Sequence, residues 1–124
     1  MTPGRQPRDD AERLRQFKAE FFKALAHPLR IGILEILRGG PLSVNQIQEA
    51  TGAPGSSVSQ QLAVLRAQDI VVTERHGTTI MYSVSDPDLF ELLDVARRIF
   101  YAHLADTVNL LRLVGRETAA AGEQ

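Results

Sequence analysis

The sequence predicts one mainly helical domain with a small β-hairpin, an α+β fold in the order α-α-α-α-β-β-α. Apolar residues recur at helical spacing over most of the chain. One stretch, residues 80–84, instead alternates apolar and polar side chains, as a half-buried strand does. The length of 124 residues, with 44% hydrophobic and 23% charged residues, fits a single folded domain and argues against a disordered chain.

The N-terminal third predicts two helices. Residues 1–10 are expected to form a flexible arm, and Asp9 or Asp10 can cap a helix that starts at Ala11, since a carboxylate accepts bonds from free backbone N–H groups. Pro28 ends this helix and suits the first turn of the next. The second helix, residues 29–38, is apolar nearly all round, which is typical of a central helix buried on several sides.

The middle of the chain predicts two short helices joined by a tight turn. Ser43 can cap the first of them, and residues 53–55 (Ala-Pro-Gly) form the turn. Ser56 or Ser57 can cap the second helix, which we expect at 56–68. Its inner face carries the apolar residues Val58, Leu62 and Leu65. Two helices of this size joined by a turn rich in Gly and Pro indicate a helix-turn-helix.

A hairpin is expected directly after this pair, over residues 70–85, with Gly77 at its tip. A helix-turn-helix followed at once by a hairpin is a winged helix. A long last helix begins near residues 86–88 (Asp-Pro-Asp) and is expected to end at Gly115. The winged-helix domain therefore spans residues 11–114, and residues 115–124 are expected to form a flexible tail.

The helix after the turn is the candidate for reading DNA. With its apolar residues inward, its outer face carries short polar side chains, and the major groove, about 12 Å wide, admits a helix when nothing bulky holds it away. Glutamine can pair with adenine, and serine contacts phosphates or base edges. Side chains at the hairpin tip can reach a neighbouring phosphate or the minor groove. The predicted DNA-binding residues are Ser56, Ser57, Ser59, Gln60, Gln61, Arg66, Arg75 and His76.

Charge and composition exclude several functions. The net charge of −1 gives no global sign of a nucleic-acid partner, but it divides into a basic N-terminal region and an acidic C-terminal region. The chain has no cysteine, which removes disulfides, thiolate metal sites and cysteine nucleophiles. No phosphate-binding loop or paired acid motif is present, so we expect neither an enzyme nor a cofactor. With no secretory signal and no long apolar run, we expect a cytoplasmic protein without a membrane partner.

Two runs of sequence carry a resemblance to a known family. They are Phe-Lys-Ala-Leu-Ala-His-Pro-Leu-Arg at 22–30 and Ser-Val-Ser-Gln-Gln-Leu-Ala-Val-Leu at 57–65, supported by Arg-His-Gly at 75–77. With them, residues 12–113 resemble the ArsR/SmtB-type winged-helix repressors of bacteria. The resemblance implies a homodimer formed through the first and last helices, binding to an inverted repeat in double-stranded DNA, and repression of transcription. It also implies release by an effector, whose identity is unknown.

Metal sensing is the first alternative. Residues 43–45 are Ser-Val-Asn where metal sensors of this family often carry Cys-Val-Cys, so that thiolate site is absent. His103 and Asp106 share one face of the last helix, and two such pairs meeting across a dimer could bind Zn²⁺ or Ni²⁺. The plainer interpretation is a histidine held by a carboxylate between two helices, so we predict no metal and keep this pair as a candidate.

The first and last helices also carry more apolar surface than a domain of this size can easily bury, which predicts a dimer. In the alternative interpretation, the apolar residues of the last helix only complete the core of the monomer. The predicted dimer interface consists of Leu14, Phe17, Phe21, Ile99, Phe100, His103, Leu104 and Leu111. Residues 39–85, which include the helix predicted to read DNA and the hairpin, have a net charge of only −1. A winged helix used for protein–protein contact is therefore a second alternative to DNA binding.

Overall fold

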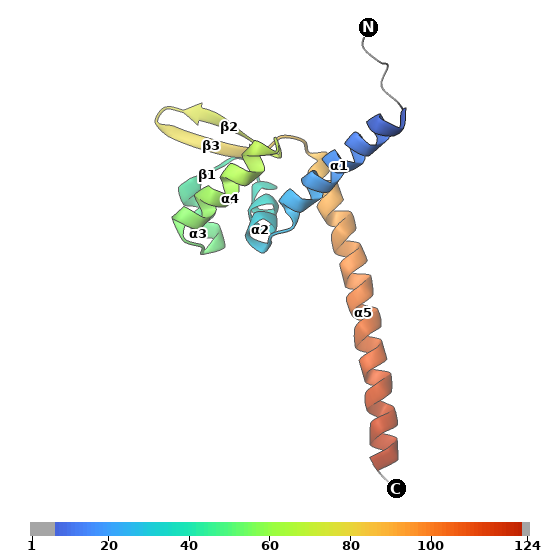
Figure 1. Ribbon diagram of the computed structural model, residues 1–124. Helices are drawn as coiled ribbons and strands as arrows, with labels where there is room; N and C mark the ends of the chain where they lie inside the picture. The colour runs from blue at the N-terminus through green and yellow to red at the C-terminus, as the bar shows by residue number, and fades with distance from the viewer. Residues whose placement is uncertain (1–6, 123–124) are drawn as a thin grey trace. The chain divides into compact units, whose positions relative to one another are not determined.

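The computed structural model describes residues 7–122, in two units that divide after Pro87. The first unit contains the helices α1 (Pro7–Leu25), α2 (Pro28–Leu37), α3 (Val44–Thr51) and α4 (Gly55–Ala67), followed by the strands β2 (Val71–His76) and β3 (Thr79–Val84) (Figure 1). The second unit is one helix, α5 (Asp88–Gly122). This order confirms the predicted winged helix-turn-helix, and a two-residue strand, β1 (Leu42–Ser43), is added to it.

The first helix starts earlier than predicted. It begins at Pro7 and not at Ala11, so residues 7–10 are helical. Proline is favoured in the first turn because its φ is already helical and the N–H it lacks has no partner there. Asp9 and Asp10 lie within this first turn, where their charges favour the positive end of the helix dipole. Residues 1–6, the remainder of the predicted arm, lie outside the described part of the chain.

The second helix begins as the sequence predicts. His27 is its N-cap, and the Nδ1 atom of His27 accepts a hydrogen bond from the backbone N–H of Leu29 at 3.2 Å. Pro28 occupies the first turn. Ile33 and Leu34 are completely buried, which agrees with a central helix.

The two helices of the helix-turn-helix have different starts. Ser43 and Gln46 form a reciprocal capping box at the start of α3, and Gly52 ends this helix in a left-handed conformation with φ 71°. The start of α4 is capped by Pro54 without any side-chain hydrogen bond, so the prediction that Ser56 or Ser57 caps it is wrong. Both serines lie inside the first turn, because the helix already begins at Gly55.

The sheet has the strand order β1-β3-β2, and both pairings are antiparallel. His76 pairs with Thr79, so the hairpin loop contains only residues 77 and 78. Gly77 has a φ of 64°, which a residue with a side chain adopts at a cost in so tight a loop. The strand β1 pairs Leu42 with Tyr82; two residues are too few for a periodic signal in the sequence.

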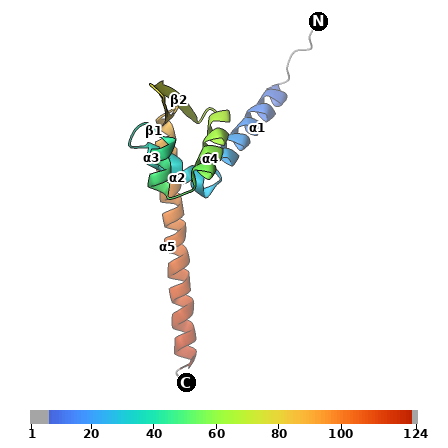
Figure 2. The same ribbon diagram turned by 90° about the vertical axis from the view of Figure 1, so that its left-hand side faces the viewer.

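The core of the first unit lies between α2, α3, α4 and the base of the hairpin. Its completely buried side chains come from each of these elements, and Figure 2 shows the three helices grouped together. They are Ile33, Leu34, Ile47, Val58, Leu62, Leu65 and Val71. The inner face predicted for the helix at 56–68 is therefore confirmed.

The last helix is longer than predicted, because it does not end at Gly115 but continues to Gly122. A glycine inside a helix costs only about 1 kcal/mol relative to alanine. Gly115 keeps a negative φ and no proline follows it, so neither the backbone nor the sequence stops the helix there.

Candidate nucleic-acid interface

The outer face of α4 is polar and accessible. Val58, Leu62 and Leu65 are at most 1% exposed. The residues on the opposite side, Ser56, Ser59, Gln60, Ala63 and Arg66, are all exposed. No bulky apolar side chain stands on that face, so α4 presents hydroxyl, amide and guanidinium groups of the kind that read base edges and phosphates.

Two of the predicted residues on α4 differ from the rest. Ser57 and Gln61 are half-buried. The Oε1 atom of Gln61 accepts a hydrogen bond from the Nε atom of Arg30 at 2.9 Å. Gln61 is thus engaged within the domain, whereas Gln60, its neighbour, extends into solvent. Periodicity separates buried from exposed positions but gives no sign of such a specific partner.

The first turn of α4 has backbone N–H groups that no side chain caps. Such a turn carries partial positive charge and favours an anion, including a DNA phosphate. The hydroxyl of Ser56, which the sequence suggested as a cap, is therefore available for an outside partner.

The wing, β2 with β3, carries the other predicted contacts. Arg75 and His76 are exposed at the end of β2, and the Nε2 atom of His76 lies 3.6 Å from the Oε2 atom of Glu74. Glu74 directly precedes Arg75 in β2, so acidic and basic side chains are neighbours close to the wing tip.

Ser85 fixes the base of the wing and was not predicted as a functional residue. Its Oγ atom lies 2.5 Å from the carbonyl oxygen of Asp69 and 3.0 Å from that of Ile70. Asp69, just after α4, has a left-handed φ of 56°, which is unusual for a residue with a side chain. Ser85, just after β3, therefore joins the base of the wing to the segment that directly follows α4.

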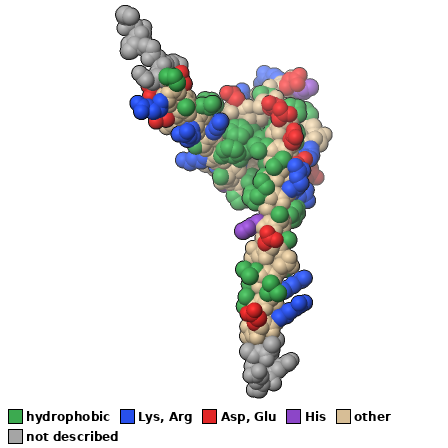
Figure 3. Space-filling view, turned by 90° about the vertical axis from the view of Figure 1, so that its right-hand side faces the viewer, with side chains coloured by type: hydrophobic (Ala, Val, Ile, Leu, Met, Phe, Trp, Pro, Cys, Tyr) green, Lys and Arg blue, Asp and Glu red, His purple; other side chains and the backbone are tan. Residues whose placement is uncertain are grey.

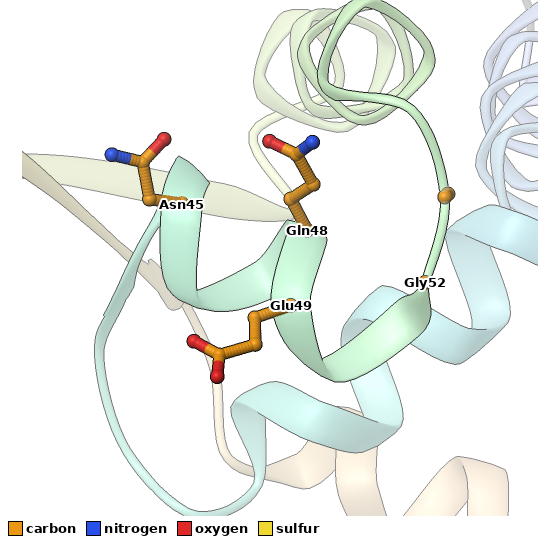
Figure 4. A pocket seen from close by; sticks show the side chains of 5 residues that line it. Asn45, Gln48, Glu49 and Gly52 are labelled. Carbon is orange, nitrogen blue, oxygen red and sulfur yellow. The ribbon is translucent and has the colours of Figure 1, made fainter.

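A shallow pocket of about 380 Å³ lies beside the turn of the helix-turn-helix, lined by Asn45, Gln48, Glu49, Gly52 and Ala53. Figure 4 shows Gln48 extending from α3 toward the start of α4, while Glu49 points the other way. A Cβ atom on Gly55 would lie 2.9 Å from the Oε1 atom of Gln48. The lining contains a carboxylate and no cation, so the pocket does not suit a phosphate.

The residues predicted for a dimer interface lie on α1 and α5. On α1, Leu14 and Phe17 are exposed, while Phe21 is half-buried and contacts Phe22 edge to face, with ring centroids 5.7 Å apart. Figure 3 shows hydrophobic side chains along α5, interspersed with charged and other polar side chains. The predicted residues of α5 that are exposed are Ile99, Phe100, His103, Leu104 and Leu111.

The candidate metal pair, His103 and Asp106, lies on the exposed surface of α5. Within residues 7–122 no group of three or more His, Cys, Asp or Glu side chains comes together to hold a metal ion. One chain therefore supplies at most two ligands here. In the same described range, no helix is long and apolar enough to cross a membrane.

Comparison with known proteins gives a consistent result. Residues 27–73 match the family described as "Bacterial regulatory protein, arsR family". The uncharacterised HTH-type transcriptional regulator Rv0081 of Mycobacterium tuberculosis is 45% identical over 103 residues, which cover 82% of this chain and 90% of the relative. The crystal structure of Rv0081 covers 84% of this chain and 99% of its own, with a TM-score of 0.70 and 42% identity.

Two further solved structures are similar. One is the homodimeric winged helix-turn-helix DNA-binding domain of Mb0332 from Mycobacterium bovis, a possible ArsR-family regulator. It has a TM-score of 0.70 and 30% identity, and the match covers 83% of this chain and 94% of the other. The second is the transcriptional repressor BigR of Xylella fastidiosa, with a TM-score of 0.65 and 32% identity, covering 77% and 97%.

Proposed function

Because the chain belongs to the ArsR family of bacterial regulatory proteins and is a DNA-binding transcriptional regulator, not an enzyme, we propose that it is a homodimeric repressor of an inverted-repeat operator. In this proposal α4 enters the major groove, the wing contacts the flanking backbone, and α1 and α5 join two copies. One observation carries the proposal: α4 buries all its large inner apolar residues and presents serine and glutamine outward.

Exposed apolar residues support the homodimer. Phe17 on α1 and Phe100 on α5 are 73% and 69% exposed in the single chain. Large apolar side chains exposed in such number are typical of a surface that a partner covers. The Mb0332 domain, of the same fold, is homodimeric. A symmetric dimer places two copies of α4 on the same side of DNA, which matches a palindromic site with half-sites one helical turn apart.

Repression is the proposed outcome of binding. BigR, at 32% identity, is a transcriptional repressor. In this proposal, a dimer bound across a promoter excludes polymerase without any further activity. Residues from two chains would be needed to complete a metal site at His103 and Asp106, so the proposal assigns no metal.

A gel-shift titration on genomic fragments, with the region upstream of the protein's own gene included, tests the proposal. We expect a retained complex, and footprinting should show two protected half-sites related by a dyad. A salt titration should give a shallow slope, because the α4 face offers only Arg66 as a cation. Transcription in vitro from the bound promoter should fall on addition of protein. If no fragment is retained at low salt, or if the protein behaves as a monomer, the proposal is wrong.

A further inference from the structure

Arg30, in the first turn of α2, joins three helices of the first unit. Its Nη1 atom donates to the carbonyl oxygen of Ala24, in the last turn of α1, at 2.8 Å. Its Nε atom donates to Oε1 of Gln61, in α4, at 2.9 Å. Both the Arg30 and Gln61 side chains are half-buried. We call this arrangement the Arg30 bridge.

The sequence explains why the carbonyl of Ala24 needs a donor from outside its helix. In a continuous helix this oxygen would accept the N–H group of the residue four positions later. That residue is Pro28, which has no N–H, and the N–H of His27 bonds to the carbonyl of Leu25. Arg30 thus supplies the missing donor and caps α1 by a side chain of the next helix.

The second half of the bridge acts on the recognition helix. Gln61 lies between Gln60, which is exposed, and Leu62, which is 1% exposed. Successive side chains of a helix are rotated by about 100° from each other. A bond that holds Gln61 therefore fixes the direction in which Gln60 points and resists rotation of α4 about its own axis.

The bridge is formed by hydrogen bonds to two neutral oxygen atoms. Arg30 has no ion pair with any acidic side chain of the described residues, so its contacts do not serve to neutralise the guanidinium. Arginine suits this task because its nitrogen atoms are held in one rigid plane and can serve two acceptors at once. Lysine has a single nitrogen on a flexible chain and cannot reproduce both directions.

We propose that Arg30 is a positioning residue for DNA recognition, which sets the rotation of α4 relative to α1 through Ala24 and Gln61. In this proposal Gln61 accepts the hydrogen bond from Arg30 and does not contact a base. Since α1 belongs to the proposed dimer interface, the bridge also links the orientation of α4 in each chain to that chain's part of the interface. This inference rests on the proposed function, because its effect appears only when the protein binds a specific site.

The test is a double-mutant cycle on full-length protein with Arg30→Ala, Gln61→Ala and the double variant, measured on the footprinted operator and on unrelated DNA. We expect each single variant to bind the operator about tenfold more weakly, a loss of ~1.4 kcal/mol, with the double variant no weaker than the worse single one. Binding to unrelated DNA should change by less than about twofold, because phosphate contacts are untouched.

A merely stabilising role would give a different result. It would lower the melting temperature but leave the ratio of specific to non-specific affinity unchanged at a temperature where the protein is folded. Gln61→Ala keeps the Ala24 cap and so provides a variant that folds even if Arg30→Ala does not. Arg30→Lys, which keeps the charge, should still lose operator affinity. Lys23→Ala is the matched control, because it removes a neighbouring positive charge from an exposed position of α1.

Three outcomes overturn the inference. Additive losses from Arg30→Ala and Gln61→Ala would mean that the two residues act separately. A changed base preference at one operator position in Gln61→Ala would mean that Gln61 reads a base. An unchanged specificity ratio in all variants would mean that the bridge only stabilises the fold. Failure of the wild-type protein to bind any fragment would instead reject the proposed function, so the two failures are distinguishable.

Discussion

The helices α4 and α5 both carry apolar residues at helical spacing, but the two sets of residues differ in burial. The large apolar residues of the α4 inner face, such as Leu62 and Leu65, are at most 1% exposed, whereas Phe100 and Leu111 of α5 are 69% and 65% exposed. The apolar face of α4 is buried within the domain, and its polar face is exposed. In the proposed homodimer, the apolar face of α5 is covered by a partner chain. A similar pattern of spacing in the sequence would then serve folding in one helix and assembly in the other.

The largest effect is expected from shortening the inner face of α4. Leu62→Ala should lower the free energy of unfolding by about 2–5 kcal/mol, because it removes buried contacts and leaves a cavity. Denaturant unfolding followed by circular dichroism measures this change. The matched substitution Leu111→Ala on α5, measured at a protein concentration too low for dimerisation, should cost less than about 1 kcal/mol. Equal losses from the two variants would remove the distinction between the helices.

The next effect sharpens the assignment of α5 to assembly. Phe100→Glu places a charge in the proposed dimer interface and should give a monomer by light scattering, with operator affinity reduced by about 100-fold or more. Asn109→Glu is the control, because it adds the same charge elsewhere on the same helix. A dimeric Phe100→Glu protein, or a control that dissociates equally, would contradict the assignment.

The polar face of α4 is tested by Gln60→Ala. We expect a loss of about 1–3 kcal/mol in affinity for the operator, with little change in binding to unrelated DNA, because a glutamine that pairs with a base edge contributes to specificity. The variant should also lose discrimination at one base pair of each half-site, which a panel of single-base operator variants would measure. Equal weakening on every sequence would show that Gln60 contacts only the backbone.

The same contrast explains how far the sequence could predict the structure. Helical spacing identified Val58, Leu62 and Leu65 as one buried face, since hydrophobic burial acts on every third or fourth residue and leaves a periodic trace. The fold and the exposed face of α4 followed from this pattern. The Arg30 bridge left no such trace, because a hydrogen bond between residues 30 and 61 depends on how two helices pack.

Helix ends were predicted less well, because several weak signals compete there. Gly115 predicted an end to α5, but its cost within a helix is small and no other stop signal follows it. Pro28, which lacks an N–H group and has a fixed φ, placed the start of α2 correctly. The serines at the start of α4 predicted a cap, yet Pro54 precedes them in an extended conformation and the helix begins at Gly55.

The smallest effect separates a helix start that is capped from one that is not. His27→Ala removes the acceptor for the N–H group of Leu29 and should lower the free energy of unfolding by about 1 kcal/mol, as measured by denaturant unfolding. His27→Asn, which offers a side-chain oxygen at the same place, should recover most of this loss. Ser56→Ala should cost less than about 0.5 kcal/mol, because Ser56 is exposed and caps nothing in the protein itself.

His27→Ala should cause the larger loss of stability, whereas Ser56→Ala should cause the larger loss of DNA affinity. Ser56→Ala removes a hydroxyl from the face proposed to meet DNA and should weaken operator binding, whereas His27→Ala should leave that affinity nearly unchanged at a temperature where both proteins are folded. If Ser56→Ala instead destabilises the fold as much as His27→Ala, its hydroxyl belongs to the helix and not to the ligand. In the proposed complex, DNA would therefore supply the hydrogen-bonding partner that the start of α4 lacks within the protein.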